Sequence, residues 1–171
     1  MIEEKLVVSD SNIFFDLIEV NLLDVFFRLP CEIVTTDFVI NEIVHPRQKA
    51  IIDGFVQLER LQVVSFDAGE FSEVMNLFSK SRNNTSITDC TVWYHARRTG
   101  GRLLTGDAKL RKSAEFDRVK VSGILYIFDN IVEYGICDKK TCAGKLRQLL
   151  MKNHRLPERE CRRRIDEWGS S

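Results

Sequence analysis

The chain has 171 residues, of which 44% are hydrophobic and 29% are charged, and it contains three prolines. This composition is typical of a globular protein of about one domain and excludes a disordered or fibrous chain. Its 25 basic and 25 acidic side chains balance to a net charge of zero. No global attraction to nucleic acid is therefore expected, although local basic patches remain open.

Targeting signals are not recognisable in the sequence. No apolar stretch approaches the roughly 20 residues that span a bilayer, and the N-terminus lacks the basic and apolar segments of a signal peptide. We therefore expect a cytoplasmic protein without a membrane partner. The five cysteines form no regular framework, which favours reduced thiols over disulfides in that compartment.

Short β-branched runs alternate with segments of helical periodicity along the chain. Strands are predicted at residues 5–10, 31–36, 62–66, 102–105 and 120–124. Helices are predicted at residues 11–29, 38–45, 48–61, 68–81, 87–99 and 108–115, with a polar loop at 82–86 and two more charged helices within 142–168. The repeating strand–helix order predicts an α/β fold with a mostly parallel sheet and helices on both faces.

Four acids occupy positions at a ligand-binding edge or on the packed side of a helix. Asp10 and Asp107 follow predicted strands, and open parallel sheets bind ligands at the carboxyl ends of their strands. Glu42 and Asp89 border the apolar stripes of their helices. Four inward carboxylates need positive charge nearby, since a bare buried ion costs several kcal/mol. Mg²⁺ or Mn²⁺ could supply it, because these hard cations prefer carboxylate oxygen and water.

Each acid also has a purely structural interpretation. Asp10 and Asp107 could cap the helices that follow them, and the stretch from Ser86 to Asp89 fits a capping box. Glu42 taken alone is typical of a solvated helix residue. Spacing does not separate capping from metal binding, and one aspartate can serve both purposes.

The chain resembles the PIN-domain family, the fold of many metal-dependent ribonucleases, including VapC-like toxins. Four segments carry the resemblance in the family's order, over about residues 6–135: "VVSDSNIFFDL", "TTDFVINEIV", "SITDCTVWYHARRTGGRLLTGDAKLRKSAE" and "VSGILYIFDNIVEYG". The resemblance implies a three-layer α/β/α fold around a parallel sheet of about four to five strands, plus C-terminal helices. Residues 1–136 would form the nuclease domain, and residues 137–171 a helical extension packed on or beside it.

The resemblance also implies roles for individual residues. The family's four acids match Asp10, Glu42, Asp89 and Asp107, and its supporting polar positions match Asn12 and Thr105. The acids would hold one or two Mg²⁺ or Mn²⁺ ions, which activate water for attack on an RNA phosphodiester. The expected function is a metal-dependent ribonuclease, with the toxin role of a toxin–antitoxin module and an antitoxin partner as further implications.

Two other classes of protein compete with this interpretation. One is a non-catalytic PIN-fold module that binds nucleic acid or acts as a scaffold; the presence of all four acids argues against such a decayed site. The other is a phosphorylation receiver domain. That domain needs an acid pair beside its first strand, and "VVSDSN" has none.

Basic residues near Asp107 could contact an RNA backbone, although ordinary solvation explains each of them equally well. They are Arg97, Arg98, Arg102, Lys109, Arg111 and Lys112. The densest basic run, at residues 159–164, alternates with acids and could be solvated or could contact RNA, a second subunit or an antitoxin.

Two further expectations concern the oligomeric state and zinc binding. A homodimer is expected because residues 12–27 are apolar enough to be covered by more than their own sheet. A zinc site is disfavoured by irregular ligand spacing; its candidates are Cys137, Cys142, His154 and Cys161.

Overall fold

The protein is described from a computed structural model that covers residues 6–81 and 83–170. In these residues five parallel strands form one sheet in the order β3-β2-β1-β4-β5. The strands are β1 (Leu6–Ser9), β2 (Glu32–Thr36), β3 (Gln62–Val64), β4 (Arg102–Leu104) and β5 (Val121–Ser122). Residue 5 of the first predicted strand and residue 82 of the predicted loop lie outside the described residues.

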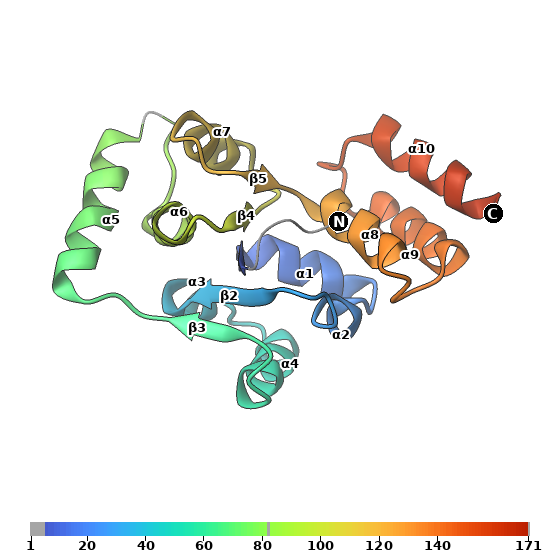
Figure 1. Ribbon diagram of the computed structural model, residues 1–171, viewed down its shortest axis with the longest axis horizontal. Helices are drawn as coiled ribbons and strands as arrows, with labels where there is room; N and C mark the ends of the chain where they lie inside the picture. Colours follow the sequence, from blue (N-terminus) through green and yellow to red (C-terminus); the bar gives the residue numbers. More distant parts are fainter. Residues whose placement is uncertain (1–5, 82, 171) are drawn as a thin grey trace.

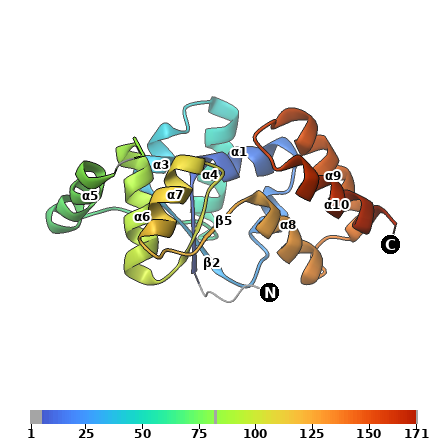
Figure 2. The same cartoon turned by 90° about the horizontal axis from the view of Figure 1, so that it is seen from above.

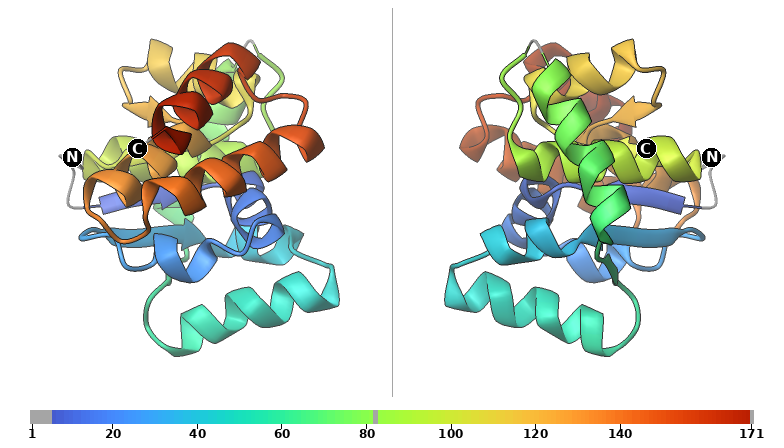
Figure 3. Two further views of the ribbon diagram at one scale, coloured as in Figure 1. Left: turned by 90° about the vertical axis from the view of Figure 1, so that its right-hand side faces the viewer. Right: turned by 90° about the vertical axis from the view of Figure 1, so that its left-hand side faces the viewer.

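Helices flank the sheet on both sides. They are α1 (Ser11–Glu19), α2 (Leu23–Phe26), α3 (Asp37–Glu42), α4 (Pro46–Gln57), α5 (Ala68–Lys80), α6 (Ile87–Thr99), α7 (Ala108–Phe116), α8 (Ile124–Glu133), α9 (Lys139–Lys152) and α10 (Glu158–Gly169). α5 and α6 lie on one side of the sheet, and α1 lies on the other with α8, α9 and α10 (Figure 1). Figure 3 shows these two opposite sides in turn. The predicted three-layer α/β/α fold is confirmed.

Local sequence signals explain most of the boundaries. The predicted helix at 87–99 is present as α6, and it ends because Gly100 takes the left-handed conformation with φ of 69°. Pro46 occupies the first turn of α4 and holds the residue before it extended, so α3 ends at Glu42 and not at residue 45 as predicted. Of the described helices, none is long and apolar enough to cross a bilayer.

Two helix predictions are wrong. The single helix expected at 11–29 is two helices, because Asn21 has φ of 54° and ends the first of them. The prediction gave no helix between the last strand and residue 142, yet α8 begins at Ile124. Ile124, Ile127, Phe128 and Ile131 of this helix are buried in the core, and the segment was interpreted only as part of a family motif.

The apolar residues at 12–27 are covered within the chain. Phe14 and Phe26 are fully buried in the core, and Phe27 stacks on Phe55 of α4 with ring centroids 4.3 Å apart. The apolar residues that motivated the homodimer are therefore already covered by the chain itself. The homodimer stays a prediction that this segment does not support.

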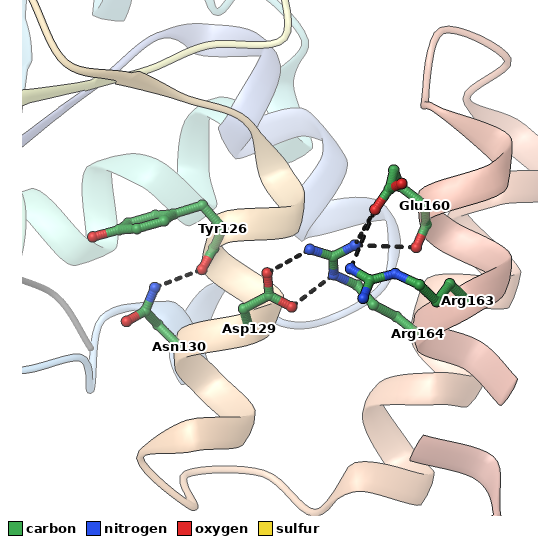
Figure 4. Close-up of polar contacts among 6 residues, drawn as sticks. All are labelled: Tyr126, Asp129, Asn130, Glu160, Arg163 and Arg164. Carbon is green, nitrogen blue, oxygen red and sulfur yellow. Dashed lines mark hydrogen bonds and ion pairs between the residues drawn. The ribbon is translucent and has the colours of Figure 1, made fainter. Parts of the chain in front are cut away.

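The C-terminal helices share the core of the sheet domain. Leu146 of α9 and Ile165 of α10 belong to the same apolar cluster as the central strand, and both helices lie beside α8 at one end of the molecule (Figure 2). Arg164 of α10 donates two hydrogen bonds of 2.7 Å to the carboxylate of Asp129 on α8 (Figure 4). The proposed boundary near residue 136 stays a prediction, and the contacts across it are extensive.

The Arg164 contact should contribute measurably to stability. Arg164→Ala removes a two-point ion pair whose arginine side chain is only 15% exposed, so the free energy of unfolding should fall by about 1–3 kcal/mol in urea denaturation. The matched control is Arg163→Ala, which removes a 61% exposed side chain with one ion pair to Glu160 and should cost at most about 0.5 kcal/mol. Equal losses in the two variants would contradict this account of α10.

Candidate metal-binding site

Asp10 lies at the carboxyl end of the central strand. β1 and β4 run parallel with Ser9 opposite Leu104, and the Asp10 backbone N–H donates to the Leu104 carbonyl at 3.0 Å. This register brings the residues that follow β4 beside the Asp10 side chain, which is 4% exposed. The most buried acid of the candidate set therefore sits where a parallel sheet normally binds its ligand.

Three donors hold the Asp10 carboxylate in place. Oδ1 accepts from the backbone N–H of Ser11 at 2.7 Å. Oδ2 accepts from Asn12 Nδ2 at 2.7 Å and from Thr105 Oγ1 at 2.9 Å. Asn12 also accepts from the Gly106 N–H at 2.8 Å through Oδ1. The two polar residues predicted to support the acids therefore link Asp10 to the loop that carries Asp107.

Asp107 and Asp89 both cap helices, as their structural interpretation predicted. Asp107 Oδ1 accepts from the N–H groups of Lys109 and Leu110 at 2.9 and 2.8 Å. Asp89 Oδ2 accepts from the Ser86 N–H at 2.7 Å within a capping box. Each cap fixes the direction of its carboxylate. Capping does not exclude a second use, since Asp107 Oδ2 accepts no hydrogen bond from a described residue.

The prediction that all four acids point inward is wrong for Glu42. It is the last residue of α3 and is exposed, because α3 ends there and its apolar contact to the core is made by Val39. Its charge nevertheless acts on Asp10. Glu42 therefore faces the same edge of the sheet from solvent, and only Asp10 among the four is fully buried.

The acids influence one another electrostatically. Burial, with smaller contributions from the charges of Asp89 and Glu42, raises the pKa of Asp10 to about 6, although the hydrogen bonds from Thr105 and Ser11 oppose the rise. Burial also raises the pKa of Asp89, with a contribution from the charge of Asp107. None of the four acids makes an ion pair with a described residue. The edge of the sheet thus carries several negative charges that no ion pair within the described residues balances.

The donor set fits a hard divalent cation in its chemistry. All candidate ligands are carboxylate oxygens, and the unbalanced charge favours a cation. Across residues 6–81 and 83–170, however, no three Asp, Glu, His or Cys side chains converge closely enough to enclose an ion. The arrangement suits a cation that keeps part of its water shell, as Mg²⁺ commonly does, and does not suit a closed protein cage.

The zinc alternative concerns three cysteines and one histidine. Cys137, Cys142, Cys161 and His154 do not gather into a metal-binding group in the described part of the chain. All five cysteines are free thiols, which agrees with the expectation of no disulfide framework.

The six basic candidates divide into two groups. Arg97 and Arg98 end α6, and Arg102 begins β4, so all three lie at the opposite edge of the sheet from Asp107. Arg97 pairs with Asp117 at 3.0 Å, and Arg98 pairs with Glu70. Arg102 stacks over the Tyr126 ring, 4.6 Å from its centroid. Their prediction as neighbours of the acids is therefore wrong.

The remaining three follow Asp107 on α7. Lys109 and Lys112 are exposed and make no ion pair with a described residue. Arg111 is half-buried, and its guanidinium donates to the carbonyls of Thr105 and Val121 at 3.4 and 3.3 Å. Two ammonium groups without an ion-pair partner among the described residues thus lie on the helix that Asp107 caps, while Arg111 holds the loop that contains Thr105.

One polar contact at this edge was not predicted. Asp16 of α1 accepts from Asn153 Nδ2 at 3.0 Å on both oxygens. Burial raises the pKa of Asp16, whereas Asn153 and the charge of Arg155 lower it. No local sequence signal could reveal this contact, because the two partners are 137 residues apart.

A family model described as PIN domain matches residues 6–170 of the chain. The chain belongs to the PIN-domain family. Members of this family are generally nucleases. The match extends beyond the segments that carried the resemblance and includes both C-terminal helices. No curated protein sequence matches the chain.

Solved structures with the same fold are distant in sequence. The chain is similar to PAE2754 from Pyrobaculum aerophilum, with 13% identity and a TM-score of 0.56 over 74% of this chain and 96% of that one. It also aligns with FitAcB from Neisseria gonorrhoeae, at 10% identity and a TM-score of 0.47 over 70% and 99% of the chains. A third match is VapBC2 from Rickettsia felis bound to promoter DNA, at 16% identity and a TM-score of 0.45 over 69% of this chain and 98% of that one. At such identities the likeness to PAE2754 shows the PIN fold alone.

The raised pKa of Asp10 predicts an unusual pH dependence of stability. Between its usual pKa of 3.8 and the folded value of about 6, the folded protein keeps a proton that the unfolded chain has lost. The free energy of unfolding of the metal-free protein therefore falls as pH rises through this window, by about 3 kcal/mol in total. Asp10→Asn removes the charge, so it should stabilise the protein by about 2 kcal/mol more at pH 7.5 than at pH 4.5.

Urea denaturation in EDTA at the two pH values measures this difference. Asp138→Asn is the control, because hydrogen bonds from Thr141 lower the pKa of that exposed helix-capping acid. Its contribution has the opposite sign, so this variant should gain no stability at pH 7.5. An Asp10→Asn variant whose stability relative to wild type is independent of pH would contradict the assignment.

Proposed function

We propose that this PIN domain is a metal-dependent ribonuclease that hydrolyses RNA phosphodiester bonds at the edge of the sheet occupied by Asp10, Asp89 and Asp107. One observation carries the proposal. A buried carboxylate with a pKa of about 6 lies among further acids, and no described basic side chain pairs with them. Strongly perturbed acids in a ligand-binding edge are typical of functional sites.

The chain's own residues have distinct tasks in this proposal. Asp10 is the fixed ligand, because its three donors leave its carboxylate one orientation. Asp107 offers Oδ2 while Oδ1 caps α7. Asp89 and the exposed Glu42 add negative charge and hold the cation directly or through water. A bound Mg²⁺ or Mn²⁺ supplies the positive charge that lowers the pKa of an attacking water and offsets charge on the phosphate.

Thr105 and Asn12 are positioning residues. Thr105 Oγ1 donates to Asp10 and accepts from the Asp107 N–H at 3.0 Å, so one hydroxyl joins two of the acids. Asn12 spans from Asp10 to Gly106. Such supporting hydrogen bonds orient metal ligands and raise their effectiveness.

The substrate strand would follow α7. Lys109 and Lys112 lie three residues apart on this helix, hence on one side of it, and both are free to contact phosphates. Contacts of this kind position nucleic acid without reading its sequence. The toxin role and the antitoxin partner stay predictions, since no contact within the chain bears on them.

A second function has one observation in its favour. Because no three metal-ligand side chains converge in the described residues, a PIN fold that binds RNA without cutting it is the alternative. The cleavage experiment that follows separates the two functions.

Asp107→Asn should abolish cleavage without unfolding the protein. Asparagine caps a helix as well as aspartate does, so α7 should persist, whereas the loss of a charged ligand should reduce kcat by about 100-fold or more. The assay is cleavage of single-stranded and structured RNAs with Mn²⁺, with Mg²⁺ and with EDTA.

Asp138→Asn is the control for this assay. Asp138 caps α9 through the Thr141 N–H at 2.8 Å, so the same chemical change occurs at a helix cap outside the acid cluster and should leave cleavage unchanged. RNA cleavage by Asp107→Asn at the wild-type rate would disprove the proposed role. RNA binding without cleavage under any metal condition would favour the binding module.

The lysines predict a second, separable effect. The double variant Lys109→Ala/Lys112→Ala should raise KM for RNA by about tenfold with little change in kcat, and the slope of log affinity against log salt should fall by about 2. The matched control is Arg97→Ala/Arg98→Ala, which removes the same charge at the opposite edge of the sheet. If both double variants raise KM equally, the effect is one of net charge and the path along α7 is wrong.

A further inference from the structure

A cavity of about 370 Å³ lies beside the residues that support Asp10. Asn12, Thr105 and Gly106 form one wall, and these residues carry the hydrogen bonds that hold Asp10. The cavity therefore adjoins the residues that position Asp10. Its volume falls at the lower end of the range for small-molecule sites in proteins.

The opposite wall comes from the connection between α9 and α10. Asn153, Arg155 and Leu156 line it. Two contacts keep this connection over α1: Asn153 donates to Asp16, and Lys152 pairs with Glu19. Within the connection, the Arg155 N–H donates to Asn153 Oδ1 at 3.1 Å. The C-terminal helices thus complete a cavity that the sheet domain alone would leave open.

The polar groups of the cavity have complementary chemistry. Arg111 and Arg155 contribute guanidinium groups. Arg155 is exposed and makes no ion pair with any residue in 6–81 or 83–170, whereas Arg111 pairs with Glu115 at 3.3 Å and donates to two carbonyls at 3.3–3.4 Å. Asp16 is the acid of the lining, and Ile124, Leu125 and Leu156 are apolar. Two cations, one acceptor and an apolar surface together suit a ligand with an anionic group and a planar heterocycle that carries N–H donors.

We propose that this cavity binds one nucleotide of the RNA strand, adjacent to the phosphate that is cleaved. The phosphate of that nucleotide contacts Arg155 and Arg111, and its base lies against the apolar wall with Asp16 as hydrogen-bond acceptor. The position next to the cleaved bond rests on the proposed nuclease function; the binding of a nucleotide does not. The C-terminal helices would then contribute to substrate selection.

Binding of single nucleotides without metal tests this proposal apart from catalysis. The full chain in EDTA is titrated with AMP, GMP, CMP and UMP and followed by amide NMR. At least one nucleotide should bind with a Kd of about 1 mM or lower and shift the amides of Asn12, Gly106 and Asn153. Arg155→Ala should weaken that binding by about fivefold or more, as expected for loss of a charged hydrogen bond.

Arg159→Ala is the control, because Arg159 is also exposed and also lacks an ion pair with a described residue, but it lies on α10 outside the cavity. This variant should bind the nucleotide as wild type does. Absence of shifts at the cavity amides with all four nucleotides, or equal binding by Arg155→Ala and wild type, would overturn the proposal. If nucleotides bind in EDTA but the protein cuts no RNA, the result would support nucleotide binding in the cavity and would count only against the proposed nuclease function.

Discussion

The structure depends on a buried carboxylate at the end of its central strand. Asp10 terminates β1 with 4% of its surface exposed, and its charge is offset by three hydrogen-bond donors and by no described cation. Burial without a counter-charge is costly, which is why the pKa of Asp10 rises to about 6. The fold accepts this cost at the edge where its parallel strands end, and such local destabilisation is common where a protein binds its ligand.

Three aspartates at this edge of the sheet cap helices and are also candidate metal ligands. Asp10, Asp89 and Asp107 each accept a backbone N–H at the start of a helix. The caps fix where the side chains lie, because the helices are themselves packed on the sheet. Structural and functional interpretations of these residues are therefore not rivals: capping would supply the positional order that the proposed, partly hydrated cation site requires.

The sequence predicted what is local and missed what is distant. Alternating β-branched runs and helical periodicities gave the sheet and its flanking helices, and Gly100 gave the end of α6. The break at Asn21 was missed because an asparagine in the left-handed conformation resembles any polar residue on a helix. Glu42 was predicted to point inward because periodicity indicates which face of a helix a residue occupies but not whether that residue is exposed. Arg102 was predicted to lie near Asp107 because periodicity does not indicate at which end of the strands a side chain lies. The contact between Asp16 and Asn153 joins segments 137 residues apart, so only tertiary packing brings it about.

Anomalous diffraction from a crystal soaked in Mn²⁺ tests the central claim most directly, since it locates the cation without requiring a substrate. The account predicts a peak beside the carboxylate of Asp10, within reach of Asp89 and Asp107, with water completing its coordination. A protein that takes up no Mn²⁺ at this edge, or binds it elsewhere while these three side chains keep only their helix caps, would contradict the claim.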